Sequence, residues 1–229
     1  MGAQWKHAGR VAAGAARGAL FTRLAKEVIM AAKSGDPSPE HNARLRAAVE
    51  AARKQSMPKD TIERCIKKGA GLLEPVNYDT VLYEGYAPHH VPIIVECLTD
   101  NKNRTASEVR VLFRKGQLGT SVMWMFDRVG VIEGTHPTGM DPEEAAIEAG
   151  AQDVQVAEDG VTFVCHLTDL NAVNTALGKM GWIMDSSEPR YLCKTPVEMA
   201  EGPEREDVVA FLEAMDEYDD VHRIHVGLK

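Results

Sequence analysis

The chain has 229 residues, of which 44% are hydrophobic and 26% are charged, proportions typical of a soluble globular protein with two or three small domains. No apolar run approaches the roughly 20 residues that a membrane-spanning helix needs, so we expect no contact with a membrane. The four cysteines contain no Cys-x-x-Cys pair. This spacing gives neither a metal signature nor a disulfide framework, and it favours reduced thiols in a cytoplasmic protein.

The charge is unevenly distributed along the chain. Residues 1–70 contain 14 Lys or Arg against 6 Asp or Glu, a formal charge of +8, whereas residues 71–229 contain 12 against 28, a formal charge of −16. A basic N-terminal third on an acidic remainder is typical of a protein that meets nucleic acid at one end. The alternative is that these Lys and Arg side chains only keep a small helical domain in solution.

The start of the chain is basic and rich in glycine. No acidic side chain occurs in the first 26 residues, and glycines at 9, 14 and 18 weaken any helix there. We expect residues 1–16 to be a mobile basic arm that becomes ordered on a partner. A mitochondrial transit peptide, which is also rich in Arg and poor in acid, is the alternative.

Three short helices are predicted next. Apolar residues recur at helical spacing from Gly18 to Lys33, from about Glu40 to Gln55, and from Pro58 to Gly69. Together they predict a helical domain over residues 1–71. It could be a helix-turn-helix variant, but no base-reading Asn, Gln or Arg stands at a clear position, so the sequence does not indicate sequence-specific readout.

A strand, a turn and a helix follow in the centre of the chain. Val81–Tyr86 and Val91–Leu98 predict two strands that pair across the Pro-His-His turn. Thr105 and Glu108 have the spacing of a capping box, so we expect a helix to begin at Thr105. A further strand is expected near Val122–Phe126. The two histidines of the turn are expected to be exposed, and contact with a phosphate or a metal is the alternative.

The remaining residues predict a second sheet and a return to the first. Residues 129–202 have the order β-α-β-β-α-β of a ferredoxin-like sandwich, and residues 203–229 read as a helix and a strand that complete the central sheet. The expected fold is therefore α+β. A three-helix basic domain (1–71) precedes two α/β two-layer sandwich domains, a central one (72–128 plus 203–229) and the ferredoxin-like one (129–202) inserted in it.

The C-terminal region is strongly acidic. Ten carboxylates lie between Glu198 and Asp220, with Arg205 as the one base among them. A solvated helix face is the ordinary interpretation of such a run, and a docking surface for a basic protein partner is the alternative.

Several segments resemble one known family. ECLTDNKNRTASEVR, from Glu96 to Arg110, resembles the signature of the YebC/PmpR family, probable transcriptional regulators related to the mitochondrial translational activator of cytochrome c oxidase subunit I. Further matches follow in order along the chain: Trp5-Lys6, residues 44–49, residues 57–62, residues 83–86 and residues 146–151. The resemblance implies a regulator that contacts DNA. It also argues against a transit peptide, because Trp5-Lys6 match the start of the family's mature chains.

Phosphate contacts are expected from cationic side chains of the arm, the three helices and the central helix. These are Lys6, His7, Arg10, Arg17, Arg23, Lys26, Arg46, Arg53, Lys54, Lys59, Lys67, Lys68, Lys102, Arg104, Arg110 and Arg114.

Enzymatic function finds little support in the sequence. The chain lacks the phosphate-binding, dinucleotide-binding, zinc-protease and serine-hydrolase motifs. Glu84 and Glu96 could form a carboxylate pair that holds a metal, which would make a metal-dependent nuclease the remote alternative. We therefore expect a non-enzymatic, nucleic-acid-binding regulator without metal or cofactor. A factor that binds the ribosome or messenger RNA is the nearer alternative, because related proteins act in translation.

Overall fold

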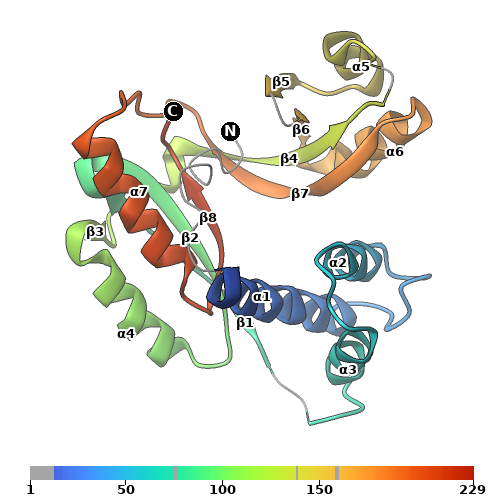
Figure 1. Cartoon of the computed structure of the whole chain (residues 1–229), viewed down its shortest axis with the longest axis horizontal. Coiled ribbons are helices and arrows are strands. Elements are labelled where there is room, and N and C mark those ends of the chain that lie inside the picture. The colour runs from blue at the N-terminus through green and yellow to red at the C-terminus, as the bar shows by residue number, and fades with distance from the viewer. Residues whose placement is uncertain (1–12, 75–76, 138, 158–159) are drawn as a thin grey trace. The chain divides into compact units, whose positions relative to one another are not determined.

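The computed structural model describes residues 13–74, 77–137, 139–157 and 160–229, and these form two compact units (Figure 1). The larger unit contains residues 13–121 with Met199–Ile224, and the smaller unit contains Val122–Glu198 with His225–Lys229. Each unit combines helices with one four-stranded antiparallel sheet, which confirms the expected α+β class. The expected boundaries of three domains stay a prediction.

Three helices of the larger unit, α1 (Ala13–Lys33), α2 (Ala43–Lys54) and α3 (Lys59–Gly69), form a bundle that we call the head. They occur where the apolar spacing predicts them, although α1 begins five residues earlier than Gly18. Their apolar stripes meet in one core, in which Val28, Leu45 and Ala52 are fully buried. Burial of a side chain the size of Val or Leu contributes about 1.5–3 kcal/mol, so the head has a hydrophobic core of its own.

The loops of the head are fixed by polar caps. The Asn42 side chain accepts a hydrogen bond from the Leu45 amide, 3.0 Å away, and so caps the start of α2. Its amide nitrogen donates to the carbonyl oxygens of Ala31 and Asp36 at 2.8 and 2.9 Å, which ties α2 to the end of α1. The chain leaves α3 through Gly71, whose φ of +74° is in the left-handed region that favours glycine.

The central sheet of the larger unit has the strand order β3-β1-β2-β8. Its strands are β1 (Asp79–Ala87), β2 (Val91–Thr99), the short β3 (Gln117–Leu118) and β8 (Val221–Val226). β1 and β2 form the predicted antiparallel hairpin. β2 is apolar on both faces and almost entirely buried, as a strand between two neighbours should be.

Two helices lie side by side against one face of this sheet, α4 (Lys102–Leu112) and α7 (Pro203–Asp216) (Figure 1). Phe113, in the short helix η3 (Phe113–Lys115) that follows α4, meets Phe211 of α7 edge to face with 5.4 Å between ring centroids. The expected return of the last helix and strand to the central sheet is thus found.

The loop between β1 and β2 is a short 3-10 helix, η2 (Pro88–His90). His89 and His90 both have left-handed backbone conformations, with φ values of +58° and +59°, which non-glycine residues adopt rarely. Both side chains are exposed, as expected for this turn. The ring Nε2 of His89 lies 3.4 Å from the Asp207 carboxylate.

Two local predictions are wrong. α4 begins at Lys102, because the side chain of Asn101 caps it by accepting from the Arg104 amide at 3.1 Å; the predicted cap, Thr105, lies inside the helix. Near Val122 the chain forms another 3-10 helix, η4 (Met123–Met125), and the strand β4 begins only at Phe126. An apolar stretch of this length does not separate a strand from a tight turn.

The smaller unit has the predicted ferredoxin-like order. Its elements are β4 (Phe126–Thr135), α5 (Pro142–Ala149), β5 (Asp153–Ala157), β6 (Gly160–His166), the 3-10 helix η5 (Leu167–Asp169), α6 (Leu170–Lys179) and β7 (Ile183–Cys193). The strands lie in the order β5-β6-β4-β7 and all pairs are antiparallel. Phe163 and Trp182 meet edge to face in the core, 4.9 Å apart. Gly130 is required beneath α6, since a Cβ there would lie 2.8 Å from the Cys165 sulfur.

None of the helices in the described part of the chain is both long and apolar enough to cross a membrane.

Candidate nucleic-acid interface

Four cationic residues of α2 and α3 form what we call the head cation group: Arg53, Arg64 and Lys67, which are exposed, and Lys68, which is half-buried. The burial of Ile62 and Cys65 turns the opposite side of α3 to solvent, and Arg64 and Lys67 are exposed there. No carboxylate within the described residues pairs with any of the four. Arg64 is missing from the predicted set, although its position opposite the apolar stripe is a sufficient signal for it.

The central sheet with α4 and α7 is the rest of the larger unit, and we call it the central unit. A second group of exposed cations lies on it, and we call it the α4 cation group: Arg110, Arg114 and Lys115. Arg110 is on the outer side of α4, because Val109 and Phe113 bury the inner side. These three also have no ion-pair partner in the described parts of the chain. Lys115 was not predicted, and the apolar pattern that ends at Phe113 gave no reason to single it out.

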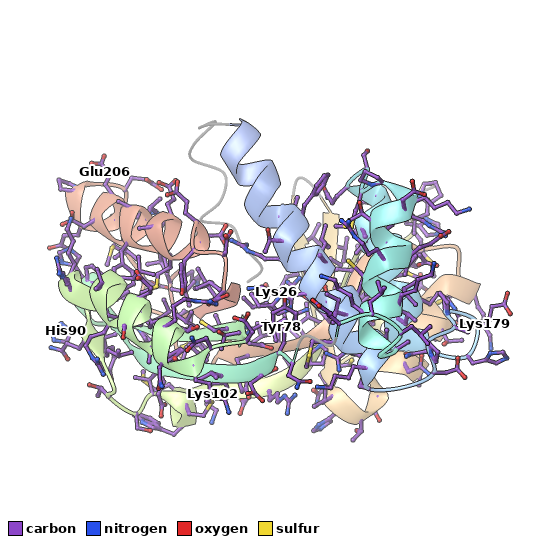
Figure 2. All side chains as sticks on the ribbon, turned by 90° about the horizontal axis from the view of Figure 1, so that it is seen from below. Lys26, Tyr78, His90, Lys102, Lys179 and Glu206 are labelled. Carbon is purple, nitrogen blue, oxygen red and sulfur yellow. The ribbon has the colours of Figure 1, made fainter. Side chains whose placement is uncertain are left out.

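Lys26 is the clearest correction to the predicted set. Its residue is 6% exposed, and its ammonium donates to the Asp220 carboxylate at 2.6 Å and to the carbonyl oxygens of Leu98 and Asp219 at 3.0 and 2.8 Å. All three N–H groups are therefore used inside the protein, and a phosphate cannot reach them. Figure 2 shows Lys26 beside Tyr78, whose ring centroid lies 5.6 Å from the Lys26 nitrogen.

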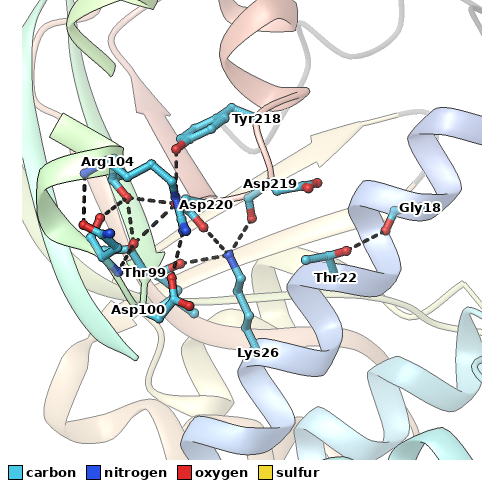
Figure 3. A network of polar contacts seen from close by, with 12 residues as sticks. Gly18, Thr22, Lys26, Thr99, Asp100, Arg104, Tyr218, Asp219 and Asp220 are labelled. Carbon is cyan, nitrogen blue, oxygen red and sulfur yellow. Dashed lines mark hydrogen bonds and ion pairs between the residues drawn. The ribbon is translucent and has the colours of Figure 1, made fainter. Parts of the chain in front are cut away.

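Asp220 is the centre of a buried polar network (Figure 3). Besides Lys26, the carboxylate has the Arg104 guanidinium 2.9 Å away, the Thr105 hydroxyl 2.8 Å away and the Tyr218 hydroxyl 3.1 Å away. Burial alone would raise the pKa of this carboxyl, but hydrogen bonds from Lys26, Arg104 and Thr105 hold the pKa well below its usual range. Asp220 is therefore ionised and fully satisfied inside the fold.

Three more of the predicted phosphate contacts are engaged within the protein. Arg23 pairs with Asp216 at 2.8 Å, and its side chain is 13% exposed. Arg104 pairs with Asp100 as well as Asp220. Arg46 donates to two backbone carbonyl oxygens of the α1–α2 loop, at 3.0 and 2.7 Å. Arg23 is thus largely enclosed by the fold, whereas Arg46 and Arg104 are exposed and also contribute internal contacts.

The other predicted cations are at the surface or outside the described structure. Lys59 and Lys102 form exposed ion pairs with Glu63 and Asp79 at 3.7 and 3.2 Å, and such pairs contribute at most about 1 kcal/mol. Both lysines can therefore exchange partners. Lys54 is also exposed. Lys6, His7 and Arg10 are outside the described residues, as is the side chain of Arg17.

Each carboxylate of the pair considered for a nuclease has another polar neighbour. Glu96 faces Arg223, with 3.9 Å between their charged atoms, and Glu84 has the Ser121 hydroxyl 3.4 Å away. In the portion of the chain that the structure describes, no three His, Cys, Asp or Glu side chains come together in a way that could hold a metal.

Comparison with known proteins now decides the family. Residues 3–72 match the model of the TACO1/YebC protein N-terminal domain, and residues 78–228 match that of the TACO1/YebC second and third domain. The chain belongs to the TACO1/YebC family. The predicted resemblance is thereby confirmed.

Close relatives of this TACO1/YebC chain cover its full length. Proteins from Pseudomonas savastanoi pv. phaseolicola and Polaromonas sp. are 52% and 53% identical to it over 233 and 236 residues, each covering 100% of this chain and 99% of the relative. Both have the name probable transcriptional regulatory protein. A crystal structure of a conserved hypothetical protein from Aquifex aeolicus is 40% identical, with a TM-score of 0.86, and the match covers 99% of this chain and 96% of that one.

The segment that shows the family resemblance has a structural role in this TACO1/YebC chain. Within Glu96–Arg110, the Thr99 hydroxyl accepts from the Asn101 amide at 2.9 Å and lies 2.7 Å from the Thr105 hydroxyl. Arg104 and Thr105 contact Asp220. The signature therefore builds the turn between β2 and α4 and its contacts to Asp220. Its last residue, Arg110, is exposed and belongs to the α4 cation group.

Proposed function

We propose that this TACO1/YebC chain is a cytoplasmic, non-enzymatic regulator of transcription that binds DNA through the head cation group. The observation that carries the proposal is the exposure of Arg53, Arg64 and Lys67 without carboxylate partners in the described residues, on a chain whose formal net charge is −8. Cations that are left unpaired in an acidic protein are available to an external polyanion. The names of the relatives, probable transcriptional regulatory proteins, support the same function.

The physical basis of binding is the displacement of counterions from phosphates. Each Lys or Arg that neutralises a phosphate releases condensed cations, so affinity falls steeply as salt rises. The acidic remainder of the chain repels the same polymer and directs the head towards it. Contacts of this kind position a protein on the backbone without reading bases.

A salt titration with a matched control tests the proposal. Arg53→Gln, Lys67→Gln and Lys68→Gln in one variant remove three positive charges from the head. Lys179→Gln, Lys194→Gln and Lys229→Gln remove three from the smaller unit. In a plot of the logarithm of the binding constant against the logarithm of the salt concentration, the slope should become less steep by up to about three units for the head variant. Each phosphate contact contributes about 0.9 to the steepness of this slope. The slope should stay unchanged for the control. Equal slopes for both variants would contradict binding through the head.

The nature of the polymer is tested separately. Wild-type protein is titrated with duplex DNA and with duplex and single-stranded RNA of matched sequence at one salt concentration, and it is crosslinked to nucleic acid in cells. Tighter binding to DNA and recovery of promoter fragments are expected. Recovery of ribosomal or messenger RNA instead would refute a role in transcription and would support the translation factor that the sequence leaves as the alternative.

A further inference from the structure

The joint between the head and the central sheet is polar. The apolar core of the head is formed by residues of α1, α2 and α3 together with Tyr78. Three charged side chains of α1 reach the central unit instead: Arg23 pairs with Asp216, Lys26 with Asp220, and Glu27 with Arg223, at 2.8, 2.6 and 3.3 Å. The two bodies are thus connected by specific ion pairs, in addition to the chain that leads from α3 to β1.

These contacts come from one stripe of α1 and go to one short segment. Positions 23, 26 and 27 are three and four residues apart, so they lie along one side of the helix, beside the stripe that buries Leu24 and Val28 in the head. Their partners all belong to residues 216–223, where α7 ends and β8 begins. One side of one helix therefore docks against one turn of the central unit.

Asp220 is the most connected residue of this turn. One carboxylate oxygen accepts from Lys26 of the head, while the other contacts Arg104 and Thr105 of α4. The residue thus links the helix that supports the head cation group to the helix that carries Arg110 of the α4 cation group. It is 5% exposed, so water does not replace these contacts easily.

We propose that Asp220 is a positioning residue for nucleic-acid binding, which holds the head in one orientation on the central sheet so that the head and α4 cation groups are presented together to one polyanion. This inference rests on the proposed function. Two binding groups held in a fixed relation engage the same polymer at a high effective concentration, and this advantage is lost when their relation varies. Asp220 itself does not touch the nucleic acid.

The orientation of the head is measured on the full chain without nucleic acid. Spin labels are placed at exposed positions, Glu50→Cys on α2 and Val111→Cys on α4, with Cys193→Ser to remove the half-buried thiol; the other three cysteines are buried. The distance distribution should be narrow in the otherwise wild-type chain and clearly broader with Asp220→Asn. Asp219→Asn is the matched control, because that exposed neighbour contacts Lys26 only through its backbone carbonyl.

Binding to duplex DNA is measured on the same variants without labels. Asp220→Asn should bind about tenfold more weakly, and Asp219→Asn should bind as the wild type does. Lys26→Met should also broaden the distance distribution and weaken DNA binding, as Asp220→Asn does. Circular dichroism must show native helix content in each variant. If Asp220→Asn does not fold, the positioning role is tested with Lys26→Met alone.

The outcomes separate this inference from the proposed function. An unchanged narrow distance in a folded variant, or a broad distance with unchanged affinity, would overturn the positioning role while leaving DNA binding intact. Failure of the wild-type protein to bind any nucleic acid would overturn the proposed function itself, and the role of the orientation in binding with it.

Discussion

Replacement of Lys26 by Met removes the buried ammonium while keeping a side chain of similar length. In the native protein that ammonium makes three hydrogen bonds, including the 2.6 Å bond to Asp220. The variant leaves a buried carboxylate and two carbonyl oxygens with one donor fewer. Breaking a buried ion pair by removing one partner typically costs about 3–5 kcal/mol. Asp220 keeps Arg104, Thr105 and Tyr218 as partners. We therefore expect the free energy of unfolding to fall by about 3 kcal/mol, the lower end of that range.

The assay is urea unfolding followed by far-ultraviolet circular dichroism, with Lys59→Met as the control. Lys59 has the same charge, but its side chain is 83% exposed, so its replacement should change the free energy of unfolding by no more than about 0.5 kcal/mol. A double-mutant cycle with Asp220→Asn isolates the pair, and a coupling free energy of about 1–3 kcal/mol is expected. If Lys26→Met were as stable as Lys59→Met, the ion pair would not hold the head to the central sheet, and our interpretation of α1 would be wrong.

Three further predictions concern acid stability, thiol reactivity and a helix cap. The pKa of the Asp220 carboxyl is lower in the folded than in the unfolded chain. The ionised carboxylate therefore contributes to stability above about pH 4, the unfolded pKa, and this contribution is lost as the pH falls towards the folded pKa. Asp220→Asn should flatten the decline of the urea denaturation midpoint between pH 5 and pH 2, and a decline identical to that of the wild type would refute this. Burial raises the pKa of Cys97 to about 12, so iodoacetamide at pH 8 should modify this thiol only after unfolding, as peptide mass mapping would reveal; rapid labelling of Cys97 in the native protein would contradict its burial. Asn101→Ala removes the side-chain cap of α4 and should cost about 1 kcal/mol, whereas Thr105→Ser, which keeps the hydroxyl, should cost less in the same urea assay.

Much of the fold follows from local patterns. The continuous apolar run of β2 predicts a strand in the middle of a sheet, and its residues are almost all buried in the structure. From β4 to β7, the alternation of strand-like and helix-like segments predicts the ferredoxin-like order without knowledge of any contact. In each case the burial of a residue depends mainly on the period of its own segment. Patterns of this kind are visible in a single sequence.

The candidate site was harder to predict because it depends on contacts between distant segments. Lys26 lies beside the apolar stripe of α1, and local spacing therefore predicts an exposed cation; its burial depends on Asp220, which is 194 positions later in the chain. Thr105 has the spacing of a cap, but its hydroxyl is directed to the same carboxylate. Arg53 and Lys67 were predicted as surface cations and are exposed, since no distant carboxylate within the described residues reaches them.

The position of β8 in the central sheet has a consequence for the order of events on the ribosome. β8 lies next to β2, yet the whole of the smaller unit's β4–β7 segment is synthesised between these two strands. The head, with a core formed almost wholly by its own helices, can fold as soon as it leaves the exit tunnel. The ion pair between Lys26 and Asp220 cannot form until residue 220 has been translated. A nascent chain that stalls before that point would have a folded head that is not yet docked on the central sheet.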